Sequence, residues 1–164
     1  VALRIASLAD SSLRARKLCE VRLLLVASPE YLDRVGRPDH PRDLETHKSF
    51  VYTNTSAPGK VRLRQVNNGN EFVLTQTPRF RADNAEAFLP ALAAGLGFGL
   101  FPEFMVGEGL ASNRFERILP DWEAPAIALY LVTPSSSLRP VRVTALLDYL
   151  VECFGQTGWL GYAK

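Results

Sequence analysis

Two polar segments carry the side chains of this sequence that are best suited to hold a small ligand. The first follows a predicted strand and consists of Tyr52, Thr53, Asn54, Thr55 and Ser56. The second is Asn84, with Ala85 and Phe88, at the start of a predicted helix. Unpaired backbone N–H groups and the positive end of a helix dipole suit a carboxylate or another anion there. The alternatives are a solvated loop at the first segment and plain N-capping at the second, where capping and binding can coexist.

Three motifs that could belong to an enzyme have simpler structural interpretations. The glycines of residues 95–99 superficially resemble a dinucleotide loop, but that loop leads from strand to helix and this one leads from helix to strand. Ser28 has no His or Asp at a relay spacing, and Ser-Pro-Glu favours helix capping. Asp83 and Glu86 could form a carboxylate pair, but a capping box also explains their spacing. We therefore predict that the chain is not an enzyme.

Composition and charge set further limits on function. The 164 residues, with 47% hydrophobic and 22% charged content, are typical of one globular domain. A net charge of +2 without a continuous basic stripe argues against nucleic-acid binding by this stretch. The sequence has no apolar run of the roughly 18 residues that a membrane span needs, and no recognisable signal peptide.

The cysteines and histidines give no sign of a metal centre. Cys19 and Cys153 lie at opposite ends of the sequence, and His40 and His47 have no metal-ligand spacing. We interpret the cysteines as reduced structural thiols, in keeping with a cytosolic protein, and the histidines as surface residues. No metal or cofactor is expected.

Hydrophobic periodicity and turn residues predict alternating strands and helices. The predicted strands cover residues 1–5, 21–26, 48–53, 61–66, 71–75, 79–82, 98–101, 115–119 and 127–132. Predicted helices begin at Ser28, after His40, at Asp83 or Asn84, near Glu103 and at Pro140. Asn68-Gly69 between two β-rich runs predicts a hairpin. Residues 14–19 are expected to form an extended or weakly helical connector, residues 121–125 a loop, and residues 155–164 a frayed tail.

The helix expected to begin at Asp83 or Asn84 determines the position of the second polar segment. Its apolar face would consist of Phe88, Leu89, Leu92 and Leu96. Gly95 or Gly97 can end it in the left-handed conformation, and residues 98–101 then form a strand covered on both faces. The order of strand, connector, α/β body, returning strand and final helix predicts two lobes, with crossings near residues 17–21 and 127–134. Ligands of such proteins bind at the carboxyl ends of the strands.

Several spaced motifs resemble the LysR-type transcriptional regulators. Residues 1–5 and 10–18 are similar to the segment that closes the first lobe in that family. Residues 26–32 resemble its ASPxYL signature, and residues 36–44 resemble the G-x-P…P-x-D-L continuation. Residues 94–102 resemble the AGLGxGLxP element, with Phe101 where Leu is more usual.

The resemblance covers nearly the whole chain and implies the effector-binding domain of such a regulator. It implies an α/β fold like the type 2 periplasmic-binding proteins, with two Rossmann-like lobes joined by two crossover strands. Residues 1–20 and 127–164 would form part of lobe I, and residues 21–126 would form lobe II. Because the chain begins without Met and already inside a strand, we expect a fragment that lacks the helix-turn-helix and the first part of lobe I. The apolar surface of Leu3, Ile5, Leu147 and Leu150 should then lack partners.

The same resemblance implies a cytoplasmic sensor of small molecules. The effector is expected to be an anionic, carboxylate-bearing metabolite, and the protein a homodimer or tetramer that contacts DNA only through the absent helix-turn-helix. Ala6 and Ser7, just past the first strand, would face the cleft from lobe I, and Phe101 would supply an apolar wall or pack in the core. A solute-binding protein of a transporter is the alternative, and an α/β enzyme is the least favoured class.

Overall fold

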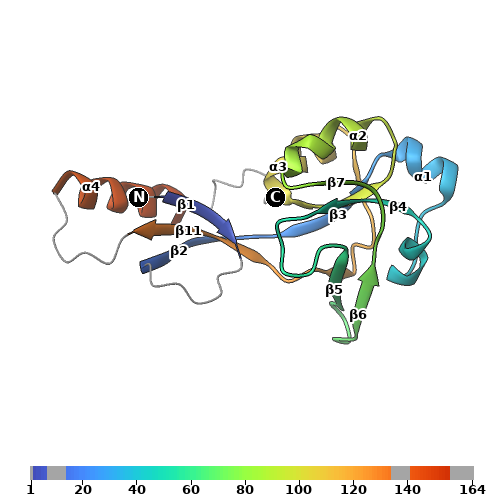
Figure 1. The fold of residues 1–164 in the computed structure, drawn as a ribbon, viewed down its shortest axis with the longest axis horizontal. Helices are drawn as coiled ribbons and strands as arrows, with labels where there is room; N and C mark the ends of the chain where they lie inside the picture. The colour runs from blue at the N-terminus through green and yellow to red at the C-terminus, as the bar shows by residue number, and fades with distance from the viewer. Residues whose placement is uncertain (1, 7–13, 134–140, 156–164) are drawn as a thin grey trace. The chain divides into compact units, whose positions relative to one another are not determined.

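The computed structural model describes residues 2–6, 14–133 and 141–155. Contacts along the chain divide it into two units, residues 1–22 with 126–164 (unit 1) and residues 23–125 (unit 2) (Figure 1). Each unit has its own sheet or sheets, and each is described below by itself.

Unit 1 contains a three-stranded antiparallel sheet in the order β1-β11-β2. Its elements are β1 (Ala2–Ala6), β2 (Arg14–Val21), β11 (Ile127–Thr133) and α4 (Val141–Gly155). Residues 14–19 are extended, which is one of the two predicted alternatives, but they are a strand and not a connector, because this segment pairs with β11 along its length. Strand β11 lies at the centre of this sheet and is the pairing partner. Pairing with a strand so distant in sequence cannot be recognised from the local sequence.

The expected unpartnered apolar surface of unit 1 is confirmed only in part. Leu3 is 46% exposed and Ile5 is 42% exposed, although both lie opposite buried leucines of β11. Leu147 is buried instead, and Leu150 is half-buried. Leu3 and Ile5 of β1 therefore remain exposed, while Leu147 of α4 is buried.

The main sheet of unit 2 has five strands in the order β7-β4-β8-β3-β9. They are β3 (Leu23–Ala27), β4 (Lys48–Tyr52), β7 (Thr77–Ala82), β8 (Phe98–Pro102) and β9 (Glu116–Arg117). Strand β4 runs parallel to both β7 and β8, whereas β3 runs antiparallel to β8 and β9. The carboxyl ends of β4 and β7 consequently meet at the same edge of the sheet.

Both faces of this sheet are covered. The helical segments are α1 (Pro29–Val35), η1 (Pro41–Glu45), η2 (Ala85–Phe88), α2 (Leu89–Ala93) and α3 (Glu103–Ala111). Alternate residues of β3 divide between two cores: Leu25 packs with residues of α1 and η1, and Leu24 packs with residues of η2, α2 and α3. Phe98 and Phe101 divide in the same way, which confirms that residues 98–101 form a strand covered on both faces.

A second sheet of unit 2 has the order β10-β5-β6. It consists of β5 (Lys60–Gln65), β6 (Glu71–Thr75) and β10 (Trp122–Glu123). The antiparallel β5–β6 pair confirms the hairpin predicted from Asn68-Gly69. The loop expected at residues 121–125 is wrong at its centre, because Trp122 is buried and pairs with Gln65.

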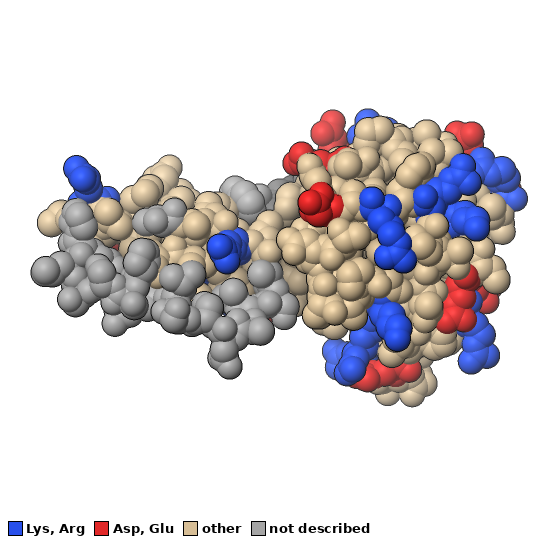
Figure 2. Space-filling view, viewed as in Figure 1, with Lys and Arg blue, Asp and Glu red and all other residues tan. Residues whose placement is uncertain are grey.

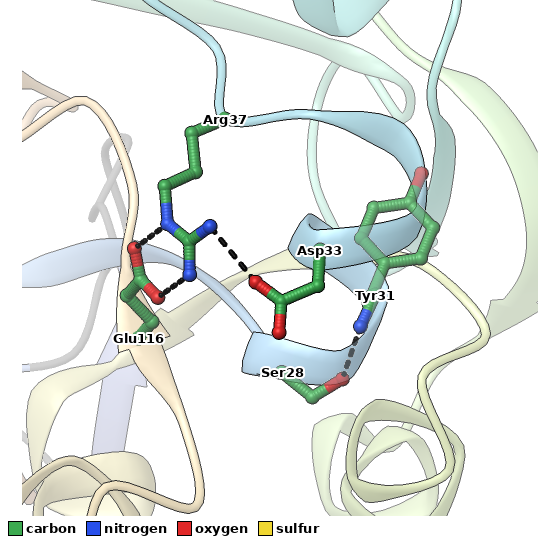
Figure 3. Close-up of polar contacts among 5 residues, drawn as sticks. All are labelled: Ser28, Tyr31, Asp33, Arg37 and Glu116. Atoms are coloured by element: carbon green, nitrogen blue, oxygen red, sulfur yellow. Dashed lines mark hydrogen bonds and ion pairs between the residues drawn. The ribbon is translucent and has the colours of Figure 1, made fainter.

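The start of α1 shows how the signature of residues 26–32 folds. Ser28 is buried and caps the helix by accepting the Tyr31 N–H at Oγ, at 3.3 Å (Figure 3). Arg37, just after the helix, donates to Glu116 through Nε and Nη2 at 2.8 and 2.9 Å, and to Asp33 at 2.9 Å. The hydrogen bonds to Glu116 and then to Asp33 raise the pKa of Arg37. This exposed clamp joins the segment after α1 to β9.

Replacing Ser28 with Ala is expected to lower the free energy of unfolding by about 1 kcal/mol, because the buried helix start loses the acceptor of one N–H group. Urea denaturation measures the change. Ser56→Ala is the matched control, since Ser56 is exposed in a loop and its loss should cost less than about 0.5 kcal/mol. Equal effects of the two substitutions would contradict the capping role.

Candidate functional site

The two polar segments singled out in the sequence come together at the carboxyl ends of β4 and β7. Tyr52, the last residue of β4, lies opposite Ala82, the last residue of β7. The Thr53 backbone N–H then donates to the Ala82 carbonyl at 2.9 Å, which extends the pairing by one residue. Since Asn84 follows Ala82 by two residues, its segment begins close to Thr53, where the first polar segment starts.

The first segment presents its polar side chains to solvent. Tyr52 is 36% exposed and Thr53 is half-buried. The remaining predicted site residues of this segment are exposed: Asn54, Thr55 and Ser56. Hydroxyl and amide groups here are therefore accessible to a ligand.

The other end of the loop after β4 is fixed by Gln76, which the sequence reasoning missed. Its backbone N–H donates to the Gly59 carbonyl at 2.8 Å, and its buried amide Nε2 donates to the Phe50 carbonyl at 3.4 Å. Gln76 thus ties the loop to β4 from the interior. A single Gln between two strands gives no periodic or motif signal, so the residue could not be identified from sequence.

Asn84 is the N-cap of the second segment, as one of the two predicted choices had it. It is exposed, and its Oδ1 accepts the Glu86 N–H at 3.0 Å. The capping box proposed for Asp83 and Glu86 is wrong, because Asn84 supplies the cap. The amide Nδ2 group of Asn84 can still donate to a ligand, so capping and binding are compatible.

The helix predicted after Asn84 is confirmed in part, because residues 85–93 are helical but are not one α-helix. A 3-10 turn of four residues, η2, precedes an α-helix of five residues, α2. Pro90 has no N–H to give the Glu86 carbonyl, which instead accepts the N–H of Leu89. Because both helical pieces are so short, the dipole argument for an anion loses force, and the polar donor groups must support it.

Phe88 and Phe101, both predicted as site residues, lie in the core of unit 2. Phe88 is 4% exposed and stacks on Phe50, with ring centroids 5.6 Å apart and planes 15° apart. Phe101 is fully buried and meets Phe88 edge to face at 6.5 Å. Phe50 also stacks on the half-exposed Phe80 at 6.0 Å. Core packing, the alternative considered for Phe101, describes both residues.

The other predicted site residues have different positions. Ala85 is half-buried in the first turn of η2. Ala6 ends β1 in unit 1, opposite Ala128. Ser7 lies outside the described residues, so its part in a site stays a prediction.

Within the described part of the chain, no three or more His, Cys, Asp and Glu side chains gather as metal ligands would. None of the helices in that part combines the length and apolar character of a membrane span. Acidic and basic side chains are both present on the face of unit 2 drawn in Figure 2. That distribution agrees with the small net charge of +2.

Comparisons of this chain with known proteins all indicate the same family. The model of the LysR substrate binding domain matches residues 1–154. The HTH-type transcriptional regulator PtxR of Pseudomonas aeruginosa is 32% identical over 157 residues, which are 95% of this chain and 49% of PtxR. An HTH-type regulator of Haemophilus influenzae is 32% identical over 152 residues, 89% of this chain and 50% of that protein. The chain thus spans about half the length of these relatives.

Solved structures that resemble this chain indicate the same family. The full-length Vibrio cholerae virulence activator AphB matches with a TM-score of 0.80 and 29% identity, over 93% of this chain and 51% of AphB. The CrgA regulatory domain from Neisseria meningitidis matches with a TM-score of 0.78 and 28% identity, over 93% of this chain and 74% of that domain. These matches confirm the predicted α/β fold class of the LysR regulatory domains. The chain belongs to the LysR substrate-binding domain family.

Proposed function

We propose that this chain is the effector-sensing domain of a LysR-type DNA-binding transcriptional regulator. Its effector is a small organic anion that bears a carboxylate. In this proposal unit 1 corresponds to part of lobe I and unit 2 to lobe II. The relatives that span twice its length are transcriptional regulators, which supports a sensing role within a longer protein.

The observation that carries the site is the 2.9 Å hydrogen bond from Thr53 N to Ala82 O. It brings together two polar segments that are about thirty residues apart in sequence, and it does so where parallel strands end. In our proposal Thr53, Asn54, Thr55 and Ser56 provide hydroxyl and amide donors from one segment. Asn84 and Ala85 provide the second side.

The available donors favour a carboxylate over a cation. Each hydroxyl can donate one hydrogen bond, and the Asn84 amide keeps two N–H donors because its oxygen is used in the cap. Asp83 and Glu86 are exposed in the same turn and oppose an anion by charge. The ligand must therefore gain more from these hydrogen bonds than it loses to the two carboxylates.

The sensing step follows from differential binding. An effector that binds one arrangement of the two units more tightly than another shifts their populations by its difference in affinity. In the full-length regulator, a cytoplasmic homodimer or tetramer in our proposal, that shift changes the spacing of DNA-binding domains. DNA contact would come only from the helix-turn-helix region beyond this chain.

A thermal-shift screen of small organic acids on the full-length protein tests this function. A binding acid at one hundred times its dissociation constant should stabilise the folded state by about 2.7 kcal/mol and raise Tm by several degrees. Asn84→Asp should remove this shift, because the new side chain keeps the cap but adds a negative charge beside the ligand. Asn84→Ser should weaken the shift less.

Thr46→Ala is the matched control on the same unit, since Thr46 is exposed and belongs to neither polar segment. It should leave the ligand shift unchanged. The carboxylate proposal fails if no acid in the screen stabilises the protein. The site proposal fails if a stabilising acid acts equally on the wild type and on Asn84→Asp.

A further inference from the structure

The tip of the β5–β6 hairpin carries a chemical feature that effector sensing does not use. Asn68 is the only asparagine of the sequence that precedes a glycine. Residues 66–70 are all exposed, at the end of the hairpin (Figure 1). Gly69 has a φ of +73°, and a Cβ placed on it would meet no atom within 4 Å. The Asn68 side chain and the α-carbon of Gly69 are therefore open to solvent.

We propose that Asn68 is a site of spontaneous deamidation in the folded protein. The Gly69 backbone nitrogen attacks Cγ of Asn68, loses its proton to a solvent base, and forms a five-membered succinimide. The side-chain amide nitrogen takes up a proton and leaves as ammonia. Water then opens either carbonyl of the ring and gives aspartate or isoaspartate. No atom changes its oxidation state, and water is the only co-reactant.

The hydrogen bonds of the turn favour the first step. The Asn70 backbone N–H donates to Asn68 Oδ1 at 2.9 Å. This oxygen gains negative charge when the nitrogen attacks Cγ, so a donor already directed at it stabilises the tetrahedral intermediate. The same bond restrains the Asn68 side chain within the turn, two residues before its donor.

One hydrogen bond opposes the reaction. The Gly69 N–H donates to the Gln65 carbonyl at 2.9 Å, and this bond must open before the nitrogen can attack. An exposed hairpin tip with few buried contacts opens locally at a small free-energy cost. The glycine also has no side chain to hinder the approach to Cγ.

Deamidation would change the tip in two ways. It replaces a neutral amide with a carboxylate. Residues 66–70, which include this position, have no other charged side chain. In the isoaspartate product an extra methylene enters the main chain. That insertion disturbs the closing hydrogen bond from Gln65 N to Asn70 O, which is 2.8 Å long here.

The test is incubation of the folded protein at mildly alkaline pH and 37 °C, followed by peptide mapping by mass spectrometry. Aspartate and isoaspartate should accumulate at position 68 before any other asparagine reacts. Asn68→Gln should lose this product, because glutamine would need a less favourable six-membered ring. Asn67→Gln is the matched control and should convert at position 68 like the wild type.

The urea-unfolded chain supplies the reference reaction. If it converts at position 68 while the folded protein does not, the Gln65 hydrogen bond protects the turn and the proposal is overturned. Faster conversion at another asparagine of the folded protein would overturn it as well. Neither outcome bears on effector binding, so the two proposals succeed or fail separately.

Discussion

Replacing Phe88 with Ala is expected to lower the free energy of unfolding by about 3–5 kcal/mol, the range for a buried aromatic side chain that leaves a cavity. Phe88 lies between two aromatic neighbours, with Phe50 stacked on it at 5.6 Å and Phe101 edge-on at 6.5 Å. At 4% exposure its ring has almost no surface left for a ligand. Urea denaturation followed by circular dichroism measures the loss.

Phe80→Ala is the matched control for the same aromatic stack. Phe80 is 42% exposed and touches Phe50 from the outer strand, so its removal should cost about 0.5–1.5 kcal/mol. Phe88→Leu should recover part of the stability and leave any effector shift in Tm intact. If Phe88→Ala left stability unchanged and removed the effector shift, the residue would belong to the site and not to the core.

The sequence was most informative where local chemistry decides the structure. The cap at Ser28 and the hairpin at Asn68-Gly69 depend on neighbours within a few positions, and both were predicted correctly. The meeting of the β4 and β7 ends was not predicted, because it depends on the parallel pairing that the structure shows. Local signals of this kind can be recognised without knowing the fold.

The predictions failed where residues that are distant in sequence determine the local structure. Residues 14–19 became a full strand because β11 pairs with them, and Trp122 joined a sheet because Gln65 lies opposite. Phe88 begins an apolar face at helical spacing, and spacing alone cannot tell whether a ring meets a ligand or another ring. The helix expected after Asn84 is divided into a 3-10 turn and a short α-helix, because Pro90 has no N–H to donate to the preceding turn.

Gly97→Ala is expected to destabilise the protein by about 3 kcal/mol, at the upper end of the range for overpacking. A Cβ at this position would lie 2.4 Å from the Lys48 carbonyl oxygen. That oxygen belongs to the backbone of β4 and cannot move aside as a flexible side chain could. Thermal and urea unfolding measure the change.

Gly36→Ala is the control that separates backbone strain from crowding. Gly36 has a φ of +93° and a ψ of 156°, where alanine is strained, but a Cβ there would meet nothing within 4 Å, so its substitution should cost about 1–2 kcal/mol. The ordering of the two variants is the test, because Gly97 has an ordinary φ and loses stability only through the close approach to β4. An equal loss in both would show that β4 can yield at Lys48. A larger loss at Gly97 supports the interpretation that the glycines of residues 95–99 are required by packing and not by a phosphate ligand.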